Sequence, residues 1–409
     1  MRKRHFIKKY LVFIIGFLPF VLFPQQKVQS PAIPNIEVPV RVFSGSQFVT
    51  ELSLQDFELY ENGIPQKIEA MYLVKKTGIE RKEEIRAMIP MVSRHFYLLF
   101  QLSDYDPQLE PTIDYIFQSL LEPGDTLTVI TPLKPYSLNQ LALSSRPKED
   151  ISKEMQHLLR KDTLTGSAEY RNLAKDLKRV TKAITGSSTS DDSDLESDET
   201  YSDFTLELVL DKYKTTLQKL ESLRLVDEKK FLNFAQNTKK RVGQKFVFFF
   251  YQREYRPEIS TNILTSMMSI YQAQQNILSD LTDLFQLYNR EMTIPVDKIE
   301  QAFADSSLSL HFIFMNKKPD HVFGVTMREQ SEDVFSAFSE IAKATGGIVD
   351  NSFTNPLSAF KKAVEVSENY YILYYFPENY IKDGTFKTIT VKVKDKNYSV
   401  SNRLGYFAN

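Results

Sequence analysis

The chain has 409 residues, of which 42% are hydrophobic and 25% charged, and its formal net charge at pH 7 is −1. This length suggests roughly two or three domains, and the near-zero charge gives no reason to expect a nucleic acid or an acidic lipid as partner. The sequence contains no cysteine, which excludes disulfides, thiolate nucleophiles and cysteine-ligated zinc.

The first 32 residues have the pattern of a signal peptide or an N-terminal anchor. A basic run from Arg2 to Lys9 precedes an apolar stretch of 13 residues, 11–23. This stretch is short for a membrane-spanning helix and is typical of a signal peptide. Ser30 and Ala32 offer small side chains at the positions that determine cleavage. We therefore expect a bacterial protein that is exported to the periplasm or the cell exterior, and that stays tethered to the membrane if the segment is not cleaved.

Residues 33–90 are predicted to form a small β unit. Residues 36–42 alternate between apolar and polar side chains, which is typical of a half-buried strand. Two further strands are expected at 56–60 and 68–74, and Asn62-Gly63 indicates a tight turn because this pair suits positive φ. A unit this small rarely buries a core alone, so we expect it to pack against its neighbour.

Residues 91–368 are predicted to form an α/β domain because strand and helix patterns alternate. The run from Phe246 to Phe250 is apolar on both faces, as in a central parallel strand that helices cover on both sides. The fold class we expect is α/β, with a doubly wound, mostly parallel sheet. In such folds, ligands bind beyond the carboxyl ends of the strands. The strands are expected at 95–101, 126–131, 245–251, 308–315 and 347–350, and the helices at 111–121, 257–288 and 332–344.

A polar insertion at about 147–243 interrupts this domain. Residues 148–183 and 206–235 have helical patterns. Residues 187–203, between them, are acidic and almost free of apolar side chains, so we expect this segment to be disordered. Its carboxylates lack the glycine and the bidentate glutamate of a calcium loop, which favours a solvated linker over a weak Ca²⁺ site.

Residues 369–409 are predicted to form a C-terminal β segment. Residues 370–376 have the pattern of an aromatic strand, and an ordinary buried strand is favoured over a carbohydrate-binding platform. Residues 386–393 and 398–400 are expected to pair as a β-hairpin. A helix is expected before this segment, at 356–366.

Several segments occur in an order that matches a known family. They lie at 54–68, 121–127, 342–347, 369–377 and 402–406. In this order they resemble the von Willebrand factor type A-related proteins of Acidobacteria and allied phyla. The resemblance covers about residues 35 to 407, apart from the insertion, and it implies a von Willebrand factor A-like fold.

The metal-ion-dependent adhesion site of that family is poorly matched. In the family, one strand runs into Asp-x-Ser-x-Ser, which holds a divalent metal, and Thr-Asp-Gly follows the central strand. Gln101, Ser103 and Tyr105 occupy the first motif here, and Gln252 stands where the resemblance implies an aspartate. Amides contribute no charge against the cost of stripping water from a cation. The resemblance therefore implies a degenerate site, and we expect neither a metal nor another cofactor.

Catalytic motifs are missing from the sequence. The five histidines form neither a His-x₃-His nor a His-Glu-x-x-His pair, and no Gly-x-Ser-x-Gly, Walker or Gly-x-Gly-x-x-Gly motif occurs. We therefore expect a protein that is not an enzyme.

The expected function is that of an exported module that binds a protein partner. The insertion helices and the loops at the carboxyl ends of the strands are expected to supply the contact surface. Two other functions stay open, a cation-dependent adhesin and an envelope-associated enzyme. The candidate partner-binding rim, for which a plain loop is the alternative, consists of Ser103, Asp104, Asp106, Gln252, Arg253 and Glu254.

Overall fold

The computed structural model describes residues 34–186, 205–224, 227–289, 294–322, 325–350 and 355–409. The predicted signal peptide or anchor at 1–32 and the acidic segment at 187–203 lie outside the described residues. Among the helices within these ranges, none combines the length and the apolar character that crossing a membrane requires.

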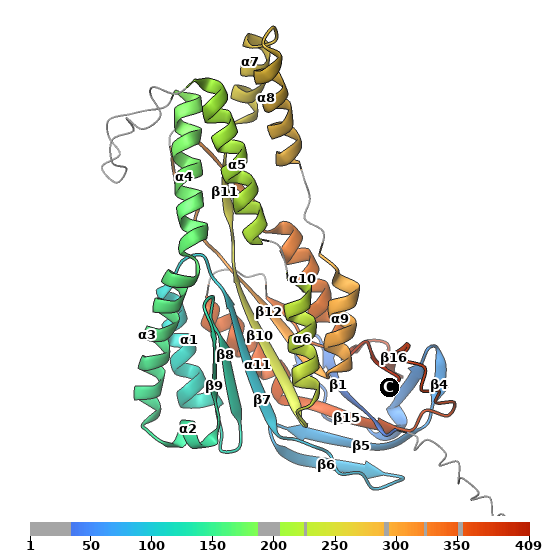
Figure 1. Ribbon diagram of the computed structural model, residues 1–409. Helices are drawn as coiled ribbons and strands as arrows, with labels where there is room; N and C mark the ends of the chain where they lie inside the picture. Colours follow the sequence, from blue (N-terminus) through green and yellow to red (C-terminus); the bar gives the residue numbers. More distant parts are fainter. Residues whose placement is uncertain (1–33, 187–204, 225–226, 290–293, 323–324, 351–354) are drawn as a thin grey trace, which may run out of the picture.

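A six-stranded mixed sheet forms the centre of the molecule, with strand order β14-β12-β10-β7-β8-β9 (Figure 1). All neighbours pair in parallel except β8 and β9, which are antiparallel. The five parallel strands lie within two residues of the predicted positions, and long apolar runs mark the three longest of them, β7, β10 and β12. Their bounds are β7 (Arg94–Gln101), β8 (Thr126–Ile130), β10 (Gln244–Gln252), β12 (Leu308–Met315) and β14 (Val349–Asp350), followed at the edge by β9 (Pro135–Leu138).

A second, antiparallel sheet joins the two ends of the described chain, in the order β17-β1-β15-β5-β6 with β2 beside β1. The aromatic β15 lies between β1 and β5, so a C-terminal strand completes the core of the N-terminal β unit. The bounds are β1 (Ile36–Ser44), β2 (Gln47–Phe48), β5 (Ile68–Lys75), β6 (Gly78–Glu84), β15 (Asn369–Tyr375) and β17 (Ser399–Asn402).

Two smaller sheets are also antiparallel. One has the order β18-β16-β3-β4, and the other pairs β11 with β13. Their strands are β3 (Phe57–Glu61), β4 (Ile64–Gln66), β11 (Tyr255–Glu258), β13 (Thr326–Glu329), β16 (Phe386–Val393) and β18 (Gly405–Phe407).

The predicted doubly wound, mostly parallel sheet is therefore wrong as the fold class of this chain. Within the described residues, ten of the fourteen strand pairings are antiparallel, and parallel pairing is confined to one mixed sheet. The physical reason is that side-chain periodicity identifies a strand but does not specify its partner, which here often comes from the other end of the chain.

The predicted C-terminal β-hairpin is wrong as well. β16 pairs with β3 and β18, whereas β17 pairs with β1. Ile389 and Val391 of β16 are buried in one cluster with Phe57 and Leu59 of β3. Burial of this alternating apolar face selects β3 as the partner of β16.

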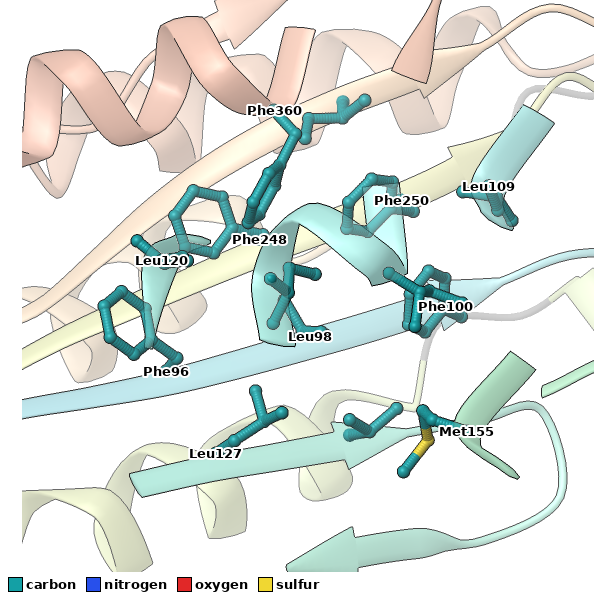
Figure 2. Close-up of a cluster of buried hydrophobic side chains, with 14 of the residues drawn as sticks. Phe96, Leu98, Phe100, Leu109, Leu120, Leu127, Met155, Phe248, Phe250 and Phe360 are labelled. Atoms are coloured by element: carbon teal, nitrogen blue, oxygen red, sulfur yellow. The ribbon is translucent and has the colours of Figure 1, made fainter. Parts of the chain in front are cut away.

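Helices cover both faces of the mixed sheet. On one face, Phe360 of α11 packs on Phe248 of β10 with ring centroids 4.6 Å apart, and Phe100 of β7 stacks on Phe250 (Figure 2). The covering helices there are α1 (Glu110–Tyr115), continued by a π-helical turn (Ile116–Leu120), α3 (Lys148–Gly166) and α11 (Pro356–Glu368). On the other face they are α6 (Glu228–Lys239), α9 (Val296–Asp305) and α10 (Glu332–Ala344).

Four further helices form what we call the helical arm, which projects beyond the sheet (Figure 1). The arm has its own core, in which Leu177, Tyr213, Leu217 and Leu281 are buried. The single helix predicted at 257–288 is wrong at its start, because residues 255–258 form β11, and it is broken near residue 271. The arm consists of α4 (Ala168–Thr185), α5 (Leu206–Arg224), α7 (Thr261–Ile270) and α8 (Gln275–Tyr288), and a short α2 (Gln140–Ser144) lies elsewhere, before α3.

Candidate binding site at the carboxyl edge of the mixed sheet

The side chain of Gln252 joins the carboxyl ends of two neighbouring strands. β7 and β10 are parallel and in contact, so the residues that follow each strand meet at one edge of the sheet. The amide oxygen Oε1 of Gln252 accepts hydrogen bonds from Ser103 N at 3.1 Å, Ser103 Oγ at 3.0 Å and Asp104 N at 2.9 Å. Gln252 and Ser103 are both buried. The amide therefore satisfies two backbone N–H groups, of which that of Ser103 is buried and that of Asp104 is partly buried.

Lys317 supplies a cation at the same edge. It follows β12, and its Nζ donates to Ser103 Oγ at 3.0 Å and forms an ion pair with Asp104. A second cation, the guanidinium of Arg171 on α4, lies 3.7 Å from Asp104 Oδ1. Ser167 Oγ, at the junction of α3 and α4, donates to Ser103 O at 2.7 Å. The edge is thus a closed polar cluster that links three strand ends to the helical arm.

Ser103, Asp104, Gln252 and Lys317 each bond to another member of this cluster. Ser103 Oγ donates to the amide oxygen of Gln252, and an amide does not take up a proton as a general base does. Within the described ranges, no group of three or more His, Cys, Asp or Glu side chains is placed to hold a metal ion. The oxygen ligands that remain, the Ser103 hydroxyl and the Asp104 carboxylate, already contact Lys317.

Glu254 and Arg253 belong to neighbouring clusters. Glu254 is buried, and Arg224 Nε donates to its Oε2 at 2.9 Å. Burial raises the pKa of the Glu254 carboxyl, while the Arg224 guanidinium acts in the opposite direction. Arg253 Nε lies 3.0 Å from Glu329 Oε1, and its guanidinium packs over the Phe314 ring. Both residues hold β10 and β11 against α5, β12 and β13.

The remaining predicted positions lie apart from Gln252. Gln101 is exposed at the end of β7. Tyr105 turns toward α1, where its hydroxyl donates to Glu110 Oε1 at 3.2 Å, and burial together with this carboxylate raises the pKa of Tyr105. Asp106 caps the next helical turn by accepting from Gln108 N at 2.9 Å. Of the six predicted rim residues, the structure therefore brings Ser103, Asp104 and Gln252 into direct contact.

Sequence reasoning missed Lys317 and Arg171. Lys317 lies two residues after a correctly predicted strand. Its position in the sequence could therefore have indicated that it lies at the carboxyl edge of the sheet. Arg171 lies in the first turn of α4, inside the insertion, where the sequence indicated a helix without indicating what it faces.

A cavity of about 500 Å³ lies beside this edge, between the sheet and α6 and α10. This volume is within the range of small-molecule sites. Its floor is formed by buried apolar side chains that include Leu99, Phe249 and Phe338. Two buried charged side chains line it, Arg224 and Glu254, and they pair with each other.

Comparisons with known proteins do not assign a family. No family model matches the chain, and no curated protein matches it significantly. Among solved structures, the human COPII-coat protein Sec24c is similar with a TM-score of 0.29 and 5% identity, over 78% of this chain and 44% of that chain. The chain thus spans less than half of Sec24c, and a likeness this low supports no argument about fold or function. The resemblance to von Willebrand factor type A-related proteins stays a prediction.

Proposed function

We propose that this protein is an exported, non-enzymatic module that binds a protein partner through the helical arm and the adjoining carboxyl edge of the mixed sheet. The observation that carries this proposal is the arm itself. Its helices extend beyond the sheet and pack around a separate apolar core (Figure 1). A projection with its own core can present a fixed surface to another molecule without being needed to complete the core of the sheet.

The arm also exposes large apolar side chains. Leu208 on α5 is 56% exposed, Ile270 at the end of α7 is 72% exposed, and Phe285 on α8 is 48% exposed. A single exposed apolar residue is common on any protein. Three exposed apolar side chains on the helical arm favour the interpretation that part of its surface becomes covered in a complex.

The polar edge supports binding over catalysis. Ser103, Asp104, Gln252 and Lys317 satisfy one another, so the cluster is rigid before any partner arrives. A preorganised surface loses little conformational entropy on association. The alternatives of a cation-dependent adhesin and an envelope enzyme gain no such support from this geometry.

The experiment is site-specific photo-crosslinking of the full-length chain in its native host. A photoreactive residue replaces Ile270 on the arm or, as a matched control, Ile381, which is 65% exposed in the loop between β15 and β16. We expect one discrete protein adduct from position 270 and none from position 381, with the adduct identified by mass spectrometry. Absence of an adduct at 270, or the same adducts from both positions, would contradict the proposal.

A further inference from the structure

A basic cleft of about 240 Å³ opens beside the polar edge, between α4 and the segment that follows β12. Two carboxylates line it, those of Asp104 and Asp320. The lining therefore carries a formal charge of +3, five cations less two carboxylates, in a chain whose net charge is −1. The five cations are Arg171, Lys175, Lys178, Lys317 and Lys318.

Internal ion pairs balance only part of this charge. Asp320 pairs with Lys178, and Asp104 is shared by Lys317 and Arg171. Lys175 and Lys318 are exposed and have no carboxylate partner among the described residues. The surplus positive charge therefore lies at these two lysines and on the Arg171 guanidinium, which shares its carboxylate.

The cations of α4 form one row. Arg171, Lys175 and Lys178 are spaced by four and three residues, so they lie on the same face of the helix. At about 1.5 Å of rise per residue, Arg171 and Lys175 are about 6 Å apart along the axis. Alternate side chains of an extended peptide are about 6.8 Å apart. The row therefore matches the spacing of acidic side chains on one face of an extended segment.

We propose that this cleft binds an acidic segment of the protein partner, with its carboxylates held by Lys175, Lys318 and Arg171. This inference rests on the proposed function and names the chemistry of the partner. A single-stranded nucleic acid is disfavoured because it needs a basic groove that tracks several nucleotides, and this charge is confined to one small cleft. Separate lysine ammonium groups act as point charges that suit carboxylates on a flexible chain.

The test measures fluorescence anisotropy of a labelled deca-glutamate peptide on the full-length protein. The cleft variant is Lys175→Glu with Lys318→Glu. The matched control is Lys382→Glu with Lys396→Glu, which makes the same change in charge at two exposed lysines in the loops that flank β16. We expect saturable binding that weakens at least tenfold in the cleft variant and less than twofold in the control, and that falls as salt screens the charges.

Several results would overturn the proposal. These are the absence of saturable binding, an equal loss in both variants, or displacement of the peptide by inorganic phosphate or an oligonucleotide at matched charge. The two proposals also fail separately. If crosslinking at position 270 captures a partner and the cleft variant leaves that capture unchanged, the acidic segment is excluded while partner binding stands. If the peptide binds the cleft but no adduct forms at 270, the proposed function fails.

Discussion

The side-chain oxygen of Gln252 lies 3.0 Å from Ser103 Oγ and 3.1 Å from Ser103 N, which fastens the carboxyl end of β10 to that of β7. The amide occupies the position at which these two strands would otherwise expose unpaired donors. Together with Lys317, it makes the edge of the mixed sheet a surface that is ordered by side chains of this chain alone.

Removal of the Gln252 amide should destabilise the protein. Gln252→Ala leaves the buried Ser103 N without an acceptor, which costs about 1–3 kcal/mol, and removes the acceptor of the partly buried Asp104 N, which adds a smaller cost. Gln252→Glu keeps an acceptor oxygen and places a negative charge near Lys317, so we expect a smaller loss. Urea denaturation measures both, with Gln218→Ala on the exposed face of α5 as the control, within about 0.5 kcal/mol of wild type. An equal effect of Gln252→Ala and Gln218→Ala would show that the amide does not join the strands.

Loss of a buried ion pair at the opposite end of β7 should lower the free energy of unfolding more than loss of an exposed pair. Arg94 Nε and Nη2 donate to the two oxygens of Asp125 at 3.0 and 2.6 Å, and both side chains are buried. Asp125→Ala leaves the buried guanidinium with only the partly exposed Glu122 carboxylate, 3.6 Å away, so the free energy of unfolding should fall by up to about 3–5 kcal/mol. Glu154→Ala removes the exposed pair with Arg146 and should cost less than about 1 kcal/mol. Similar losses in the two variants, measured by denaturation, would contradict this ranking.

Stability should fall in mild acid because of His311. The ring is fully buried, and burial, with a smaller contribution from Arg41, holds its pKa well below the usual value. Ile348 N donates to Nδ1 at 3.3 Å, so the neutral ring carries its proton on Nε2, beside Ser367 Oγ. The unfolded chain takes up a proton below about pH 6.5, whereas the folded ring stays neutral, so each further pH unit lowers stability by up to about 1.4 kcal/mol.

The pH prediction is checked by denaturation midpoints between pH 7.5 and pH 5. His311→Gln should remove this component of the pH dependence, even if it lowers stability overall. His157→Gln is the matched control because His157 is exposed on α3. A pH dependence that is identical in wild type and His311→Gln would exclude His311 as its source.

Divalent cations should not bind the polar edge. Lys317 already contacts the Ser103 hydroxyl and the Asp104 carboxylate, and the Gln252 amide adds no charge that would offset the dehydration of Mg²⁺. Calorimetry of wild type with millimolar Mg²⁺ should therefore give no saturable isotherm. One site per chain in that titration would instead support the cation-dependent adhesin.

The sequence predicted individual strands far better than their partners. Both ends of β12 were predicted correctly, because its eight apolar-rich residues are bounded by polar ones. The aromatic β15 was also located, yet its burial on both faces suits any covered strand, and nothing in residues 370–376 specifies β1 and β5 as neighbours. Strand pairing at long sequence separation depends on the packing of the whole chain.

The candidate site was predictable only in part. Ser103 follows β7 and Gln252 ends the adjacent strand β10, so the sequence could place both residues at the same edge of the sheet. Lys317 could not be assigned a contact, because a flexible lysine reaches any carboxylate within the length of its stem. Arg224 likewise could not be assigned its distant contacts. Glu221 lies three residues earlier on the same helix, but the partners Glu254 and Asp333 come from separate parts of the chain.

The most direct test of the account is photo-crosslinking from position 270 repeated in the presence of EDTA. If the arm and the self-contained polar edge bind a protein partner, the same discrete adduct should form with and without the chelator. No adduct under either condition, or an adduct that forms only when Mg²⁺ is restored, would contradict the account.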